Sequence, residues 1–266
     1  MKAIVCIKQV PESPDPKDIR FEGHAYSLSS EGIPHVINPF DLYALEEGLR
    51  MKDAHGGSVT VLTMGPQKAL EALREAMAMG ADQAILLHDP AFKGGDSLAT
   101  ARVLAAAVRK LGEFDVLLCG MQSIDGSTAQ VGPAIAGFLK IPQLTYVAKV
   151  DSIDFGAKKT TVHRMLETGK EIVDCALPAV ITVVKDINQP RFASLLKVRK
   201  ASKAEIPVWT AQDLGLDPSK IGEAGSPTKL VDSRQPQPRV GGEILQGEPE
   251  EAVAALVQRI LDTKML

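Results

Sequence analysis

The segment from Gly120 to Gly132 combines residue types that suit a phosphate group. It reads GMQSIDGSTAQVG and lies between an apolar run, VLLC at 116–119, and a segment with a helical apolar pattern. Small residues let the backbone approach a ligand, Ser127 and Thr128 offer hydroxyl groups, and the free N–H groups at a helix N-terminus favour an anion. The segment therefore predicts a phosphate-binding loop. A helix cap followed by a turn would explain Ser127 and Thr128 equally well, so the residues alone leave both interpretations open.

Other signatures of nucleotide chemistry do not occur in the sequence. Neither GxGxxG nor GxxxxGK[ST] is found, so hydride-transferring dinucleotide enzymes and P-loop NTPases lose support. Residues 94–97, GGDS, resemble the SGGxDS loop of ATP pyrophosphatases, but one intervening residue is missing and the segment follows the third predicted strand instead of the first. The similarity to ATP pyrophosphatases is therefore weak.

The sequence predicts no catalytic residue and no metal site. GxSxG, HExxH and a paired-carboxylate motif are absent, and the histidines lack the spacing of metal ligands. These histidines are His24, His35, His55, His88 and His163.

Composition excludes several classes of protein. The chain has 266 residues, 45% of them hydrophobic and 24% charged, which is typical of a globular protein with a substantial core. The net charge of -3 argues against a general binder of nucleic acids or anionic membranes.

The termini and cysteines predict a cytoplasmic protein. The apolar stretch after Met1 is too short for a signal peptide, and the longest apolar run, Ala176 to Val184, is too short to cross a membrane. Three cysteines, at 6, 119 and 175, form no CxxC pair, so we expect buried free thiols.

The phosphate loop needs a scaffold, and the first half of the chain predicts one. Strands are expected at 2–7, 58–64, 84–87 and 116–119, each followed by a segment with helical periodicity. Helices are expected after Asn38, which precedes Pro39 as an N-cap would, from about 70 to 80, after Asp96 or Ser97, and from about 128 to 139. This alternation predicts an α/β fold with a doubly wound, mostly parallel sheet. Ligands of such sheets bind at the carboxyl ends of the strands, here the loops 8–16, 64–67, 88–97 and 120–132.

The second half of the chain departs from that rhythm. Segments 144–150, 158–165 and 171–184 have no long helix between them and predict added antiparallel strands. We expect a nucleotide-binding domain over 1–206 and an extended arm over 207–266 with one amphipathic helix, 249–261. The arm is expected to wrap around another chain; a tail without fixed structure is the alternative.

Several motifs, in a fixed order, resemble the β (small) subunit of electron-transfer flavoproteins. They extend from Met1 to about Ile206. The motifs are VCIKQVP (5–11), INPFDLYALEEGLRMK (37–52), GP (65–66), AMAMGAD (76–82), GMQSIDGSTAQVGP (120–133), LPAVITV (177–183) and NQPRFASL (188–195). A further stretch, 89–100, is similar to the D-x-x-F-x-G-x-D-x-x-A-T pattern of the electron-bifurcating and related anaerobic branch.

The resemblance implies an electron carrier that is not itself an enzyme. Its partner would be a larger α subunit that carries most of the principal FAD, and the heterodimer would exchange electrons with a flavin-dependent dehydrogenase such as an acyl-CoA dehydrogenase. The small subunit would hold a second nucleotide, FAD or AMP, and the 89–100 stretch favours FAD. Whether electrons are bifurcated stays open, and an ATP-pyrophosphatase-like enzyme or a nucleotide-sensing module remains the alternative.

Carried over by motif, the residues that the resemblance implies would contact the second nucleotide lie at the predicted strand ends. They are Cys6, Asn38, Pro39, Phe40, Asp41, Met64, Gly120, Met121, Gln122, Ser123, Ile124, Asp125, Gly126, Ser127, Thr128, Ala129, Gln130 and Val131.

The P-R-F-A-S-L stretch implies a docking loop for the partner dehydrogenase, with Arg191 and Leu195 as its key residues. An apolar pair, Leu195 and Leu196, lies among basic residues, which would give a hydrophobic anchor within a charged rim. From the residues alone, packing of these leucines on their own domain is the alternative.

Overall fold

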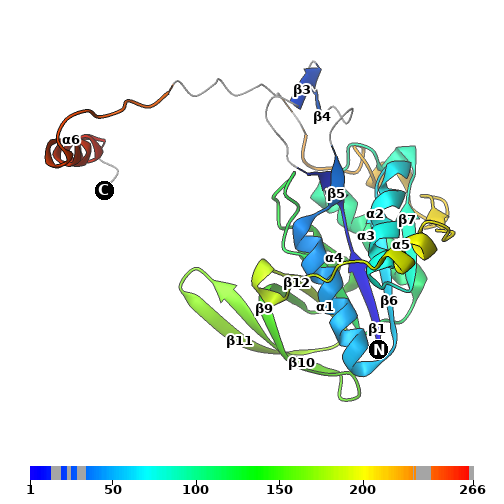
Figure 1. Ribbon diagram of the computed structural model, residues 1–266. Coiled ribbons are helices and arrows are strands. Elements are labelled where there is room, and N and C mark those ends of the chain that lie inside the picture. Colours follow the sequence, from blue (N-terminus) through cyan, green and yellow to red (C-terminus); the bar gives the residue numbers. More distant parts are fainter. Residues whose placement is uncertain (13–18, 23–24, 29–33, 230, 232–240, 264–266) are drawn as a thin grey trace.

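A nine-stranded sheet forms the centre of the protein. The computed structural model describes residues 1–12, 19–22, 25–28, 34–229, 231 and 241–263 (Figure 1). The strand order is β11-β10-β9-β12-β8-β1-β6-β7-β13. Strands β9, β12, β8, β1, β6, β7 and β13 are parallel to one another, whereas β10 pairs antiparallel with both β9 and β11. The strands are β1 (Lys2–Cys6), β6 (Ser58–Met64), β7 (Gln83–Leu87), β8 (Val116–Gly120), β9 (Gln143–Asp154), β10 (Lys159–Leu166), β11 (Gly169–Ala176), β12 (Ala179–Val183) and β13 (Val208–Trp209).

Helices cover both faces of the parallel part of the sheet. They are α1 (Pro39–His55), α2 (Leu70–Met79), α3 (Ser97–Leu111) and α4 (Val131–Leu139). Helices α1 and α2 pack on the face to which Val5 points, whereas α3 and α4 pack on the face of its neighbour Ile4, because successive side chains of a strand alternate. The predicted doubly wound α/β fold is therefore confirmed.

One segment was predicted as a single strand and forms two. Residues 171–184 divide at the cis Leu177–Pro178 bond into β11 and β12. Strand β11 pairs antiparallel with β10, while β12 returns to the parallel part of the sheet between β8 and β9. All residues of β12 are buried, which explains its continuous apolar sequence, AVITV.

The cysteines differ in burial. Cys6 and Cys119 are buried free thiols, as expected, whereas Cys175 is only partly buried. The expectation was wrong for Cys175 because β11 is the edge strand of the antiparallel extension, where fewer neighbours cover a side chain.

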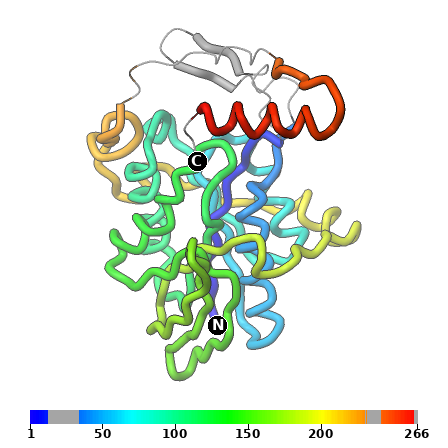
Figure 2. Tube along the Cα trace, turned by 90° about the vertical axis from the view of Figure 1, so that its left-hand side faces the viewer, coloured from blue at the N-terminus to red at the C-terminus, as the bar shows by residue number. Residues whose placement is uncertain are grey.

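The segment expected to form an arm divides into two parts. Residues 207–229 pack against the domain: β13 pairs with β7, and Ala211, Ile221 and Ser226 are buried. Of the later residues, the described ones include α6 (Pro249–Asp262), in which no side chain is buried. In both Figure 1 and Figure 2, α6 lies toward the top of the view and the antiparallel extension toward the bottom. The domain therefore continues beyond residue 206.

Smaller elements complete the description. Strand β2 (Gln9–Pro11) pairs with β5 (His35–Ile37), and β3 (Ile19–Glu22) pairs with β4 (Ala25–Leu28). Short helices are η2 (Gln67–Ala69), η3 (Pro90–Phe92), η4 (Lys185–Ile187), α5 (Leu195–Ala201) and η5 (Pro218–Lys220). Among the described residues, we find no helix with the length and apolarity needed to cross a membrane.

Candidate functional site

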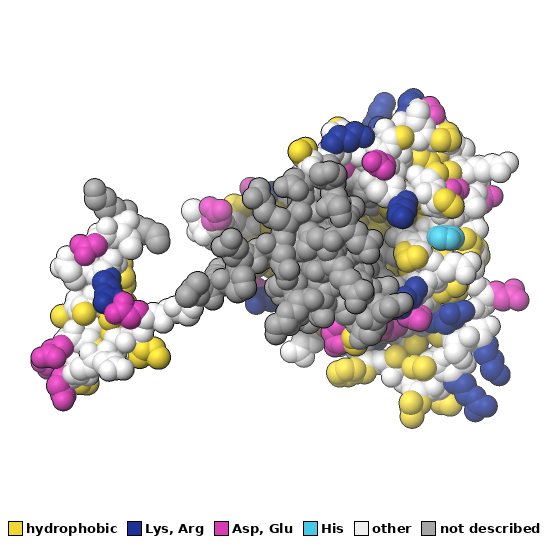
Figure 3. Space-filling view, turned by 90° about the horizontal axis from the view of Figure 1, so that it is seen from above, with side chains coloured by type: hydrophobic (Ala, Val, Ile, Leu, Met, Phe, Trp, Pro, Cys, Tyr) yellow, Lys and Arg dark blue, Asp and Glu magenta, His cyan; other side chains and the backbone are white. Residues whose placement is uncertain are grey.

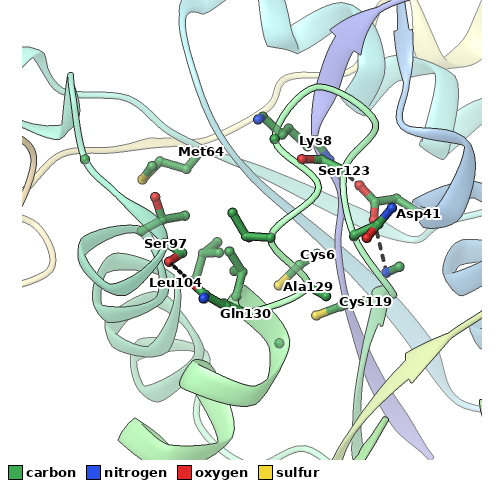
Figure 4. Close-up of a pocket in the computed structure, with 18 of the residues that line it drawn as sticks. Cys6, Lys8, Asp41, Met64, Ser97, Leu104, Cys119, Ser123, Ala129 and Gln130 are labelled. Carbon is green, nitrogen blue, oxygen red and sulfur yellow. Dashed lines mark hydrogen bonds between the residues drawn. The ribbon is translucent and has the colours of Figure 1, made fainter. Parts of the chain in front are cut away.

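A cavity of about 470 Å³ opens at the carboxyl ends of β1, β6 and β8, where ligands of parallel sheets bind (Figure 4). Cys6, Met64 and Gly120, the last residues of these strands, all line it. The described lining also includes Ile7, Lys8, Asp41, Phe92, Gly94, Gly95, Asp96, Ser97, Thr100, Leu104, Cys119, Met121, Gln122, Ser123, Gly126, Thr128, Ala129, Gln130, Val131 and Gly132.

The structure brings most of the predicted site residues to this cavity. Six of them lie outside its lining, namely Asn38, Pro39, Phe40, Ile124, Asp125 and Ser127. Nucleotide binding stays a prediction both for the predicted residues that line the cavity and for the six that do not. The sequence motifs and the cavity nevertheless lie at the same strand ends.

Asn38 supports the predicted phosphate loop instead of capping α1 with its side chain. Its amide donates a hydrogen bond to the carbonyl of Gln122 (2.8 Å), and its side-chain oxygen accepts one from the backbone N–H of Ile124 (3.1 Å). No side-chain hydrogen bond caps α1. Pro39 has no N–H to satisfy at the start of this helix, so the buried Asn38 side chain is available to hold the loop.

Asp41 joins three elements beneath the cavity. Its carboxylate accepts hydrogen bonds from the backbone N–H groups of Lys8 (2.8 Å) and Gly120 (3.0 Å), which ties the ends of β1 and β8 to the first turn of α1. Burial raises the pKa of Asp41 to about 7, against the opposing effect of these hydrogen bonds. A side chain at Gly120 would place its Cβ 2.4 Å from the Asp41 carboxylate, so only glycine fits there.

The backbone of the predicted phosphate loop differs from the expectation. Helix α4 begins at Val131, not near 128, and Ser127 and Thr128 do not cap it. Instead, Ser127 and Ala129 have left-handed backbone angles (φ 49° and 53°), and Gln130 follows in the right-handed region. Alternation of this kind turns successive N–H groups to one side and makes a concave anion site, here directly before a helix N-terminus. These backbone angles therefore give a stronger physical reason to expect a phosphate here than a helix cap by Ser127 or Thr128 would.

A second wall of the cavity was not assigned from the sequence. It consists of the β7–α3 connection and the start of α3, including Phe92, Gly94, Gly95, Ser97 and Thr100. Ser97 donates a hydrogen bond to the side-chain oxygen of Gln130 (2.5 Å), which links this wall to the loop before α4 (Figure 4). The loop 88–97 and the 89–100 motif both indicated this region in the sequence, although no residue of either was predicted as a site residue.

Asp96 supports this second wall from the side of the C-terminal segment. Its carboxylate caps α3 by accepting hydrogen bonds from the N–H groups of Leu98 and Ala99. Its own N–H donates to the buried Ser226 hydroxyl (2.8 Å). The segment predicted as an arm thus supports the cavity wall indirectly, through the hydrogen bonds of Ser226 and Thr228 with Asp96.

Two more lining residues illustrate what sequence reasoning missed. Cys119 lies in register with Cys6 on the neighbouring strand, and both thiols are buried beside the cavity. A Cβ at Gly132 would lie 2.5 Å from the Thr182 methyl group, so this glycine lets α4 approach the sheet. Neither feature has a signature in a single sequence. Among the residues that the structure describes, no cluster of His, Cys, Asp and Glu is suited to a metal.

The predicted docking residues have different environments. Arg191 forms ion pairs with the buried Glu46 (2.8 Å) and with Asp53 (2.8 Å), so it holds its loop against α1 and adds little free positive charge. Leu195 is 88% exposed and Leu196 is 84% exposed. The alternative in which these leucines pack on their own domain is therefore wrong for the chain as described.

Comparison with known proteins agrees with these features. The family model of the electron transfer flavoprotein domain matches residues 27–214. The electron transfer flavoprotein subunit beta of Thermoanaerobacterium thermosaccharolyticum is 46% identical over 261 residues, covering 98% of each chain. The caffeyl-CoA reductase-Etf complex subunit CarD of Acetobacterium woodii is 41% identical over the whole of both chains, and the protein FixA of Azorhizobium caulinodans is 46% identical over 86% of this chain and 82% of its own.

These matches do not favour an ATP-pyrophosphatase-like enzyme or a nucleotide sensor. Both the family model and full-length relatives agree with the motifs at the strand ends. The chain therefore belongs to the electron transfer flavoprotein family, among its β subunits.

Proposed function

We propose that this chain is the small subunit of a heterodimeric electron carrier and holds a second nucleotide in the cavity at the ends of β1, β6 and β8. The larger α subunit would carry most of the principal FAD. The observation that carries the proposal is the convergence of the loop before α4, with its left-handed residues, and the strand ends on one cavity. Family membership and the names of the relatives support an electron-transfer role.

The residues of the cavity fit a phosphate-bearing nucleotide. Gly126 lines the cavity, and the nearest atom that its Cβ would meet is the Ser123 hydroxyl at 3.4 Å, so the glycine leaves open space that a ligand can occupy. We expect the N–H groups from Gly126 to Ala129 to bind the phosphates. The flavin of the complex supplies the redox chemistry, and this chain supplies position, electrostatics and a docking surface.

The second nucleotide is FAD or AMP, and FAD is our first choice. Residues 89–100 carry the motif that favours FAD, and Phe92, Gly94 and Asp96 from this stretch line the cavity. If FAD is bound, the complex would hold two flavins, which electron bifurcation requires. If AMP is bound, a carrier without bifurcation follows.

Two exposed apolar surfaces support the proposed partners. Leu195 would anchor a flavin-dependent dehydrogenase, such as an acyl-CoA dehydrogenase, because its exposed side chain stands at the start of α5, directly after a loop that Arg191 fixes to α1. Helix α6 would bind the α subunit with its exposed stripe of Val253, Leu256, Val257, Ile260 and Leu261. Figure 3 shows hydrophobic side chains (yellow) along this helix. A cytoplasmic location would suit both partners.

Purification of the native protein tests this function. We expect a yellow complex with a second, larger chain that is reduced by a flavin dehydrogenase and does not turn over ATP. A colourless single chain that hydrolyses ATP would contradict the proposal and would revive the enzyme alternative.

A further inference from the structure

Lys8 has an unusual position for a surface lysine. Among the described residues that line the cavity, it is the one with a positive charge, while Asp41 and Asp96 are acidic. Its backbone is fixed on both sides, because its N–H donates to Asp41 (2.8 Å) and its carbonyl accepts from the N–H of Asn38 (2.8 Å). The side chain thus starts from a rigid point at the end of β1.

The ammonium group of Lys8 is paired with the predicted phosphate loop. Its Nζ atom lies 2.6 Å from Oδ2 of Asp125 and 2.8 Å from Oδ1, and the Lys8 side chain remains about half exposed. Although burial raises the pKa of Asp125, hydrogen bonds from Lys8 and Ser123 hold it below its usual value. Asp125 directly precedes Gly126, and Figure 4 shows Lys8 beside Ser123 of the same loop.

We propose that Lys8 selects phosphate-bearing ligands by exchanging Asp125 for a phosphate oxygen when a nucleotide enters the cavity. This inference rests on the proposed nucleotide site. A phosphate carries more charge than a carboxylate, and an ammonium–phosphate hydrogen bond is correspondingly strong. Without Lys8, the described lining would present the phosphate with the acidic Asp41 and Asp96 and with no positive side chain to offset them. Asp125 therefore competes with the ligand for the same ammonium group.

The competing interpretation is a clamp that only shapes the loop. In that case the Lys8–Asp125 pair would matter equally for every ligand, and loss of either residue would weaken binding. In the exchange interpretation the two residues have opposite effects, and both effects depend on the phosphate. Adenosine and AMP share the nucleoside and differ by the phosphate, so they separate the two interpretations.

Calorimetric titration of the full-length protein tests the exchange. The protein would be purified with any subunit that accompanies it, freed of nucleotide, and titrated with adenosine and with AMP. We expect Lys8→Gln to weaken AMP binding by about tenfold or more and to change adenosine binding by less than about twofold. Asp125→Asn should strengthen AMP binding by a few-fold, and Lys8→Arg should keep most of the affinity.

Controls make the outcomes decisive. Lys149→Gln, which breaks a comparable ion pair with Asp151 on β9, should change neither ligand's affinity. The AMP affinity of the wild type should fall with salt more steeply than that of Lys8→Gln. Equal weakening of adenosine and AMP in both Lys8→Gln and Asp125→Asn would overturn the exchange in favour of a clamp. A wild-type protein that binds neither of these ligands and no FAD would instead contradict the nucleotide site itself.

Discussion

The cavity and the exposed apolar surfaces are built in opposite ways. Around the cavity, polar groups are paired within the chain: the buried Asn38 binds residues 122–124, the buried Asp41 binds two strand ends, and Ser97 binds Gln130. On the predicted docking loop and on α6, large apolar side chains are exposed, including Phe192 at 99% and Leu195 at 88%. The difference suggests that the ligand site is complete within the chain, whereas the surfaces need partners to bury them.

The largest effect is expected at the cavity. Gly126→Val would place a branched side chain in the phosphate loop, so the second nucleotide should be lost while thermal stability changes little. Chromatography of a denatured extract and a melting curve measure the two effects.

Gly137→Val is the matched control, because a Cβ at Gly137 of α4 meets no atom within 4 Å. It should retain the nucleotide. Full nucleotide content in Gly126→Val would mean that the phosphates bind elsewhere.

Helix α6 should show the next largest effect. Leu256→Asp introduces a charge into the exposed apolar stripe and should weaken association with the larger subunit by about 100-fold. Glu251→Gln, on the opposite side of the helix, should not. Size-exclusion chromatography across a range of concentrations measures the association, and equal behaviour of the two variants would rule out α6 as the contact.

Leu195 should affect electron transfer and not stability. Leu195→Ala should slow electron exchange with a partner dehydrogenase by about tenfold, because an interface anchor is lost. Its melting temperature should stay unchanged, since the side chain is already exposed. Stopped-flow reduction of the flavin measures the rate.

Leu49→Ala provides the contrast in a buried helix position. The Leu49 side chain is 1% exposed, so its loss should cost about 2–5 kcal/mol of stability. If Leu195→Ala behaves like Leu49→Ala and keeps its transfer rate, Leu195 is not a docking residue.

The last expected effect concerns Asp41 and the pH dependence of stability. The pKa of this carboxyl is about 7 in the folded state and 3.8 as the ordinary value, so between these pH values only the folded state keeps the proton. The Asp41 contribution to stability therefore falls as the pH rises from about 4 to about 7 and is constant above. Asp41→Asn should lack this fall. Parallel pH dependence of urea unfolding in both proteins would contradict the raised pKa.

Local sequence patterns predicted most of the sheet and part of the site, but not the features that depend on the folded chain. The periodicity of apolar residues and the turn residues identify elements of the parallel sheet. A buried strand such as β12, for example, is a continuous apolar run. They do not show that β11 and β12 divide at Pro178, because the division depends on pairing: β11 pairs with β10, whereas β12 pairs with β8 and β9. The loop before α4 was recognised by its small residues, whereas its left-handed angles at Ser127 and Ala129 belong to the folded backbone.

Residues brought in from distant parts of the chain were the hardest to predict. The Ser226 hydroxyl accepts a hydrogen bond from Asp96 of the cavity wall, and Arg191 forms an ion pair with Glu46. The two residues of each pair are far apart in sequence. Cys119 was not predicted as a lining residue because its place beside the cavity depends on its register with Cys6. Family motifs identified part of the site, but they could not reveal these pairings.

The nucleotide content of the purified complex tests the central claim most directly. The protein would be denatured, its released nucleotides separated by chromatography, and their amounts divided by the amount of complex. We expect one adenine nucleotide per copy of this chain, FAD or AMP, in addition to the principal FAD of the larger subunit. A single FAD per complex and no second nucleotide would contradict the proposal that this cavity binds one.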